Sequence, residues 1–216
     1  TSAAGDKILL TEGGGDIEFV TSDDALTFAT SDILLSNGSN LVITTSGGAV
    51  SIQDIDGHSS EDVTINASGG TTNTISVGTI GVDVADGINT VALTASSGIT
   101  LNGNITTSNS AGNTVTLTGP VTLGDDVTIT TNTAGTDGNI EFTSTIDGTQ
   151  ALSLQAGSAD ITVDGIIGGG TQVASLNFDA ANIEVFDIGD ADTVGVSGGT
   201  DINSNTQLTL DGDLYK

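Results

Sequence analysis

The amino-acid sequence predicts an all-β fold, a parallel β-helix (β-solenoid) of about ten coils of roughly 21 residues, with no significant helix. Three observations lead to this prediction. A short phrase recurs along the chain, apolar and polar residues alternate in short runs, and 31 glycines separate those runs. We expect residues 1–216 to form a single β-solenoid domain, either as a segment of a longer chain or as a fibre subunit.

The recurring phrase consists of a small or turn residue, then Asn or Asp, then an apolar-polar-apolar triplet. It is found at Asp16–Phe19, Asp32–Leu35, Asn139–Phe142, Asp160–Val163 and Asn182–Val185. Steps between the branched residues of successive phrases range from 16 to 25 residues. A β-sandwich has no reason to repeat at such a period, whereas one coil of two or three short strands fits it. We therefore expect one recurring corner and strand in each coil, while the rest of the coil absorbs insertions.

Period-two alternation bounded by Gly, Asn, Asp or Ser is the strand-and-turn signal of an all-β protein. Clear runs of three residues begin at Leu26, Leu41, Val50, Val63, Val91, Val115, Val127, Leu152, Leu176 and Leu208. No segment has apolar residues at i, i+3, i+4 and i+7, so no helix is expected. Strands of about three to five residues suit coils better than hairpins. Pro120, the one proline, is expected at a corner, and Phe19, Phe28, Phe142 and Phe178 are expected in the core.

The charge of the chain limits its partners. There are 28 acidic residues against two lysines, Lys7 and Lys216, with no arginine, so the formal net charge is −26. Phosphate binding requires Lys and Arg to displace counterions, so we expect no nucleic-acid partner. The same charge repels anionic membranes, and no apolar run approaches the ~20 residues that a membrane helix needs, so we expect no membrane insertion. The acidic field would attract divalent cations.

We expect no enzymatic activity and no catalytic or cofactor-binding residue. The lone histidine, His58, lies in a turn-rich segment, and transition-metal sites need several His or Cys ligands. Polysaccharide lyases on β-helices need Arg or Lys beside the substrate, but both lysines lie near the chain ends. Glycoside hydrolases need a pair of carboxylates at a defined separation. Carboxylates abound here, although sugar-stacking aromatics are scarce.

The acidic clusters are the best site candidates, and calcium is the only metal they suggest. Asp187, Asp190 and Asp192 are suitably spaced on a predicted turn. Calcium takes about six to eight oxygens from carboxylates and loop carbonyls. The other interpretation of the acidic clusters is a solvated face that keeps the rod soluble. The remaining clusters are Asp23/Asp24, Asp54/Asp56/Glu61/Asp62, Asp83/Asp86, Asp125/Asp126 and Asp211/Asp213.

Neither end of the sequence is typical of a solenoid cap, which has a polar outer face. The first residues already contain the apolar run Ile8–Leu10, and Leu208–Leu210 still alternates like a strand. Two hypotheses follow. The chain is either an internal stretch of a longer β-helix or a subunit that stacks end to end with further copies into a filament.

Part of the sequence resembles a known family. The segments Ile99–Thr107, Val115–Gly124, Gly138–Gly148 and Gln150–Gly157 are similar to repeats of filamentous-haemagglutinin-like large bacterial surface proteins, the β-strand-repeat adhesins. The resemblance covers roughly residues 98–180 well and the rest of the chain loosely, and the first half departs from the pattern because its phrases are less regular. It implies a right-handed β-helix, export to the cell surface, and an adhesive or scaffolding role, and it carries over no catalytic residues.

These observations together predict a structural, non-catalytic extracellular protein, a β-solenoid segment or subunit of a bacterial cell-surface filament or adhesin. Its expected partners are further copies of itself and a host-surface or matrix polysaccharide. The alternative is a carbohydrate-binding or carbohydrate-processing β-helix protein. A concave groove with paired carboxylates and an aromatic side chain would favour that alternative, whereas a smooth rod would favour the filament.

Overall fold

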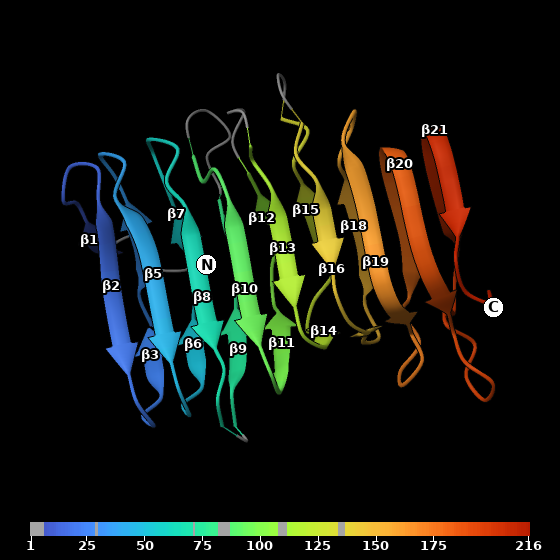
Figure 1. Cartoon of the computed structure of the whole chain (residues 1–216), viewed down its shortest axis with the longest axis horizontal. Coiled ribbons are helices and arrows are strands. Elements are labelled where there is room, and N and C mark those ends of the chain that lie inside the picture. The colour runs from blue at the N-terminus through green and yellow to red at the C-terminus, as the bar shows by residue number, and fades with distance from the viewer. Residues whose placement is uncertain (1–6, 29, 71, 82–86, 108–111, 134–136) are drawn as a thin grey trace.

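The computed structural model describes residues 7–28, 30–70, 72–81, 87–107, 112–133 and 137–216, which form a parallel β-solenoid of about eight turns (Figure 1). Short strands from successive turns lie side by side and pair in parallel. The described residues contain no helix, and thus none that is long and apolar enough to span a membrane. The all-β parallel fold expected from the sequence is confirmed.

Three faces, here named A, B and C, make up each turn. Face A contains β2 (Asp16–Thr21), β5 (Asn40–Thr45), β8 (Val63–Ala67), β10 (Val91–Ala95), β13 (Val115–Thr118) and β16 (Ile140–Phe142). Face B contains β3 (Leu26–Phe28), β6 (Val50–Ile52), β9 (Thr74–Val77), β11 (Gly98–Leu101), β14 (Val121–Leu123) and β17 (Ile146–Asp147). Face C contains β1 (Lys7–Leu10), β4 (Asp32–Leu35), β7 (Ile55–Asp56), β12 (Ile105–Thr106), β15 (Val127–Thr130) and β18 (Ala151–Gln155).

The last turns use longer strands than the sequence predicts. β19 (Asp160–Ile167), β20 (Ser175–Ile188) and β21 (Thr200–Leu210) have 8, 14 and 11 residues, and each passes from one face to the next. The expectation of uniformly short strands is wrong here because the strand bends at a corner through a register shift. Such shifts occur between Val163 and Ile166 and between Ala180 and Asn182. A bulge of this kind bends a strand without ending it.

The turn is longer than the expected period. Successive inward partners on face C lie 22 to 25 residues apart, as in the column Ile33, Ile55, Ile80, Ile105 and Ile129. The short steps of 16 and 17 residues arise because the phrases at Ile17, Ile33 and Val50 lie on faces A, C and B. The estimate of ten coils therefore counted strands from different faces as separate turns. Eight turns at about 4.8 Å each give a rod roughly 40 Å long.

The core is a stack of inward apolar side chains, one column for each inward strand position. Phe142 and Phe178 are fully buried, in agreement with the sequence prediction. Phe19 and Phe28 are half-buried in the first turn and pack edge to face, with ring centroids 5.6 Å apart. Because inward positions alternate with outward polar ones, a register slip of one residue would turn every apolar side chain of a strand outward.

Pro120 occupies a corner, as expected, between β13 and β14. It is exposed, and its carbonyl accepts the backbone N–H of Ile99 at 2.7 Å. Gly119 before it has a φ of 122°, and a Cβ there would collide with the carbonyl of Ala95 in the neighbouring turn. Only glycine fits such a position, because it combines positive φ with close backbone approach.

Side chains of Asp, Asn and Thr link successive turns where face A begins. Asn40 Nδ2 donates to Asp16 Oδ1 at 2.9 Å, and Asn40 Oδ1 accepts the backbone N–H of Asp62 at 2.9 Å. Asp62 Oδ1 in turn accepts the hydroxyl of Thr90 at 2.7 Å. In the later turns Asp160 receives Nδ2 of Asn182 at 2.7 Å. We call this series the corner ladder, and it explains why Asn or Asp precedes the apolar triplet in the recurring phrase.

Replacing Phe142 by alanine should destabilise the fold by about 3–5 kcal/mol, because the ring is buried between Leu117 and Val163 of the adjacent turns and leaves a cavity. The measurement is urea unfolding followed by far-ultraviolet circular dichroism. Phe186→Ala is the matched control, since that ring is 39% exposed. Equal losses of stability in the two variants would contradict the inward columns described above.

Candidate functional site

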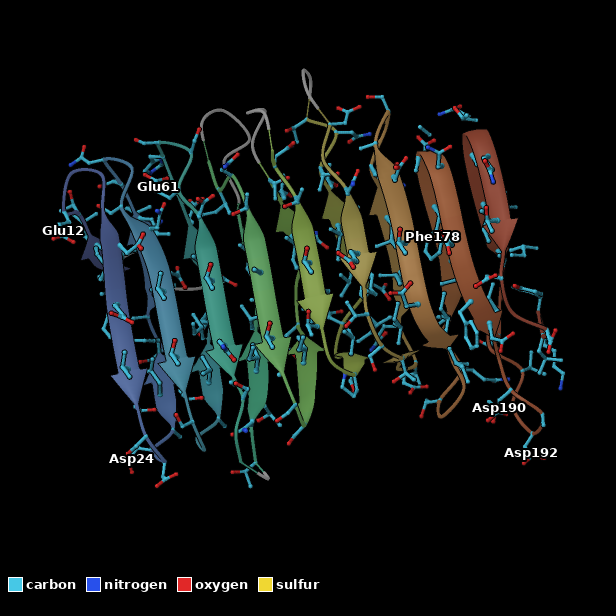
Figure 2. The ribbon with its side chains drawn as sticks, viewed as in Figure 1. Glu12, Asp24, Glu61, Phe178, Asp190 and Asp192 are labelled. Carbon is cyan, nitrogen blue, oxygen red and sulfur yellow. The ribbon has the colours of Figure 1, made fainter. Side chains whose placement is uncertain are left out.

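The calcium candidate Asp187 lies at the end of β20. Asp190 and Asp192 lie in the turn that follows (Figure 2). Asp190 Oδ1 accepts the backbone N–H groups of Asp192 at 2.9 Å and Thr193 at 2.7 Å. Asp187 Oδ1 accepts the N–H of Leu214 at 2.7 Å. One carboxylate oxygen on each of Asp187 and Asp190 is therefore already engaged by the backbone, while Asp192 is exposed.

A side-chain cation contacts this turn. Lys216 Nζ donates to the carbonyl oxygens of Asp190 at 2.9 Å and Ala191 at 3.1 Å. The hydrogen bonds from the Asp192 and Thr193 backbone lower the pKa of Asp190, and the charge of Lys216 adds a smaller effect. Within the described ranges no three His, Asp or Glu side chains are grouped closely enough to hold a metal ion. Calcium binding by Asp187, Asp190 and Asp192 stays a prediction.

The calcium hypothesis predicts that millimolar Ca²⁺ raises the melting temperature of the protein relative to EGTA, because a ligand that binds only the folded state stabilises it. Asp190→Asn should abolish the difference, since it removes one ligand charge while keeping an acceptor for the turn. Differential scanning calorimetry measures both. A transition that is the same in Ca²⁺ and in EGTA removes calcium from consideration.

Several acidic side chains in the clusters have a structural role that the sequence did not reveal. Carboxylate Oδ1 atoms accept backbone N–H groups one turn further along: Asp54 from Thr79 at 2.6 Å, Asp126 from Ala151 at 2.8 Å, and Asp187 from Leu214. Asp62 does the same for Thr90, and so does Asp147, outside the clusters, for Thr171. Asp23, Asp24 and Asp125 are exposed, as a solvated face requires, and Asp83 and Asp86 lie outside the described residues.

Glu61 contradicts the solvated-face interpretation most clearly. Its side chain is fully buried near one end of the rod (Figure 2). Oε2 accepts the N–H groups of His58 at 2.9 Å and Ser59 at 2.8 Å, and Oε1 accepts that of Gly38 at 3.1 Å. These charge-assisted bonds hold the corner loop of its own turn and join it to the previous turn. His58 itself is exposed on that loop.

Glu61→Ala should destabilise the protein by roughly 2–4 kcal/mol, because three backbone N–H groups lose their acceptor inside the structure. Glu61→Gln keeps an acceptor oxygen and should lose less. Thermal and urea unfolding give the comparison, with Asp192→Ala as the exposed-carboxylate control. Equal losses of stability in Glu61→Ala, Glu61→Gln and Asp192→Ala would show that the hydrogen bonds of Glu61 do not stabilise the fold as described.

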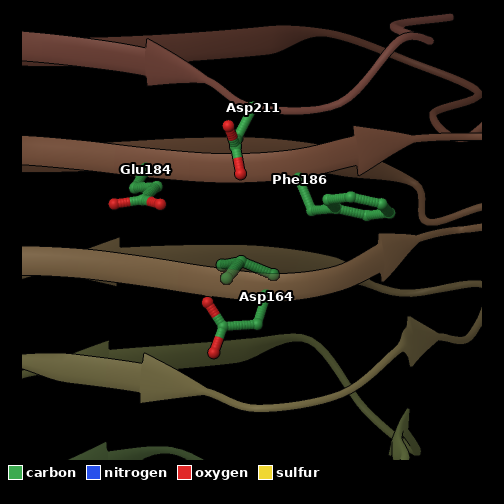
Figure 3. A pocket seen from close by; sticks show the side chains of 5 residues that line it. Asp164, Glu184, Phe186 and Asp211 are labelled. Carbon is green, nitrogen blue, oxygen red and sulfur yellow. The ribbon is translucent and has the colours of Figure 1, made fainter.

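The outer surface of face A is hollowed over the last three turns. A shallow pocket of about 210 Å³ is lined by Val163, Asp164, Glu184, Phe186 and Asp211 (Figure 3). The side chains come from neighbouring strands β19 and β20 and from the residue that follows β21. Figure 3 shows Phe186 with Asp211 in the turn on one side and Asp164 in the turn on the other side.

A second hollow of about 170 Å³ adjoins the first and shares Glu184 with it. Its lining is polar, with Asp160, Thr162, Asn182, Gln207 and Thr209. The two hollows together form a strip of carboxylates, hydroxyls and amides beside one exposed aromatic ring. We name this strip the face A groove. Such a surface can accept hydroxyl donors along a chain while the ring provides an apolar stacking surface.

Phe186 was not among the site residues predicted from the sequence. The signal was available: Phe186 directly follows the inward residue Val185, and alternation therefore places it outward, unlike the four phenylalanines expected in the core. Glu61 was missed for a different reason. A buried glutamate in a run of polar residues looks the same as an exposed one until the loop conformation is known.

No family model matches this chain, and neither a curated protein nor a solved structure shows detectable similarity to it.

Proposed function

We propose that the chain is a structural, non-catalytic β-solenoid of an extracellular bacterial cell-surface filament or adhesin. The proposal rests on the exposure of inward apolar side chains in the first and the last turn. Ile17 and Phe19 are only half-buried at one end, while Leu208 and Leu210 remain 42% and 48% exposed at the other. These side chains stand in the inward columns of face A, so a further turn at each end would bury them.

The rest of the molecule supports a rod that continues. The inward columns continue from β1–β3 to β21 (Figure 1), and on face C isolated bridges at Ile80 join the three-stranded sheet β1–β4–β7 to β12. Another copy that stacks end to end would supply such a turn at each end. We propose a right-handed coil, since parallel strands joined by crossovers within one sheet have that hand in nearly all proteins. The resemblance of residues 98–180 to adhesin repeats supports a location at the cell surface.

Negative-stain electron microscopy of the purified 216-residue chain across a concentration series tests the proposal. We expect rods longer than the roughly 40 Å of one copy, with lengths that grow as the protein concentration rises. Added salt should lengthen the rods, because it screens the repulsion between copies of net charge −26. Single rods of constant length at every concentration and salt would contradict self-association.

The face A groove favours a second candidate function, binding of a polysaccharide. Its ring and carboxylates form the combination that suits sugars, and the acidic lining would repel uronic acids and accept neutral or amine-bearing sugars. A polysaccharide that binds along successive turns would present its repeating sugar units to the repeating turns of the solenoid. In an adhesin, the rod would place such a surface away from the cell.

Phe186→Ala should reduce binding to a neutral β-glucan by at least about tenfold if the groove binds sugars, because the stacking surface is lost. Affinity electrophoresis through gels containing the polysaccharide measures this, and Phe186→Tyr, which keeps the ring, serves as the control. Wild-type migration unaffected by the polysaccharide would exclude this candidate function.

A further inference from the structure

We propose that the second copy stacks head to tail in one defined register, with β21 of one copy lying against β1 and β2 of the next; this inference rests on the self-association proposed above. The register is obtained by continuing the existing ladder by one turn. On face C the column that contains Phe178 and Ile202 begins at Ile8 in the first turn. Ile202 of one copy therefore faces Ile8 of the next.

Face A continues in the same way. Its inward columns begin at Ile17 and Phe19 and end at Leu208 and Leu210. In the stacked register Leu208 packs on Ile17 and Leu210 packs on Phe19, so the two most exposed inward leucines cover the two half-buried residues of the first turn. On face B, Tyr215 pairs with Ile188 and would face Leu26. All four columns gain an apolar neighbour at the junction.

The charges at the two ends fit this register. Lys7 is the only basic residue of the first turn, and its column on face C ends at Asp201. The junction therefore places the Lys7 ammonium of one copy beside the Asp201 carboxylate of the other. The chain has 28 acidic residues and only two lysines, and this register places one of the two lysines opposite a carboxylate of the neighbouring copy.

The corner ladder also continues across the junction. Its first member is the carboxylate of Asp16, and the residue at the corresponding position of the last turn is Gln207, the register partner of Asn182. An amide of one copy thus meets a carboxylate of the next, as Asn182 meets Asp160 within one copy. Glu18 meets the uncharged Thr209. No two carboxylates face each other at these positions of the junction.

The free edge of β21 suits such pairing. It has 11 residues, and among the described strands it pairs only with β20. It contains no Lys, Arg or Pro, the residues that usually protect an edge strand from further pairing. Because the surfaces that meet are different, the contact is heterologous and does not close, and it generates an open filament instead of a dimer.

Charge reversal tests the register. Asp201→Lys would face Lys7 with a second ammonium, and Lys7→Glu would face Asp201 with a second carboxylate. Each variant alone should associate roughly three- to tenfold more weakly than wild type in sedimentation velocity experiments, since an attractive exposed pair becomes repulsive. Asp125→Lys, at an exposed carboxylate between β14 and β15 in the middle of the rod, is the control and should not weaken association. Circular dichroism confirms that each variant is folded.

Mixing the two variants gives the decisive result. Every junction in an alternating mixture pairs Lys with Glu or Lys with Asp, so the mixture should regain filaments that neither variant forms alone at the same total concentration. Two results would overturn the register but not the proposed filament. In the first, wild type forms filaments but the mixture of variants does not. In the second, each single variant associates as strongly as wild type. A wild-type chain that stays monomeric under all conditions would overturn both.

Discussion

The in-register parallel backbone ladder is the constraint on which the rest of the structure depends. Each strand finds its partners in the turns before and after it, so the hydrogen bonds of a turn are satisfied only by its neighbours. The ladder places every inward side chain on top of its equivalent one turn away, which builds the apolar columns. It also brings outward Asp and Asn side chains within reach of the next turn, where they bind backbone N–H groups. Core, corners and acidic surface are therefore consequences of one repeat.

The sequence predicted the fold class because alternation and turn residues are local signals. The phrases at Asp16, Asn139, Asp160 and Asn182 do mark equivalent corners of face A. The period was wrong because the phrases at Asp32 and Val50 look the same but belong to other faces. Three faces with the same alternation produce the same local pattern, and only the pairing of strands distant in sequence separates them.

The site residues were harder to predict from the sequence. Burial of Glu61 depends on a corner loop that brings the backbone of Gly38, His58 and Ser59 toward one carboxylate. No pattern in the sequence predicts this loop conformation. Phe186 could have been placed outward by counting from Val185, but Asp164 and Asp211, which line the same hollow, come from the turns before and after it. The same holds for Lys216, whose contact with the turn at Asp190 joins residues at least 25 positions apart.

Engineered disulfides test the central claim, the register of the ladder, most directly, since the chain has no cysteine of its own. Thr116 and Glu141 are outward register partners on neighbouring strands of face A, 25 residues apart. Cysteines at these two positions should cross-link rapidly under mild oxidation, because adjacent strands place their Cα atoms about 5 Å apart. Cysteines at Thr116 and Asp137, which match the period of about 21 residues expected from the sequence alone, should not. Cross-linking of the second pair in preference to the first would contradict the register and the proposals that rest on it.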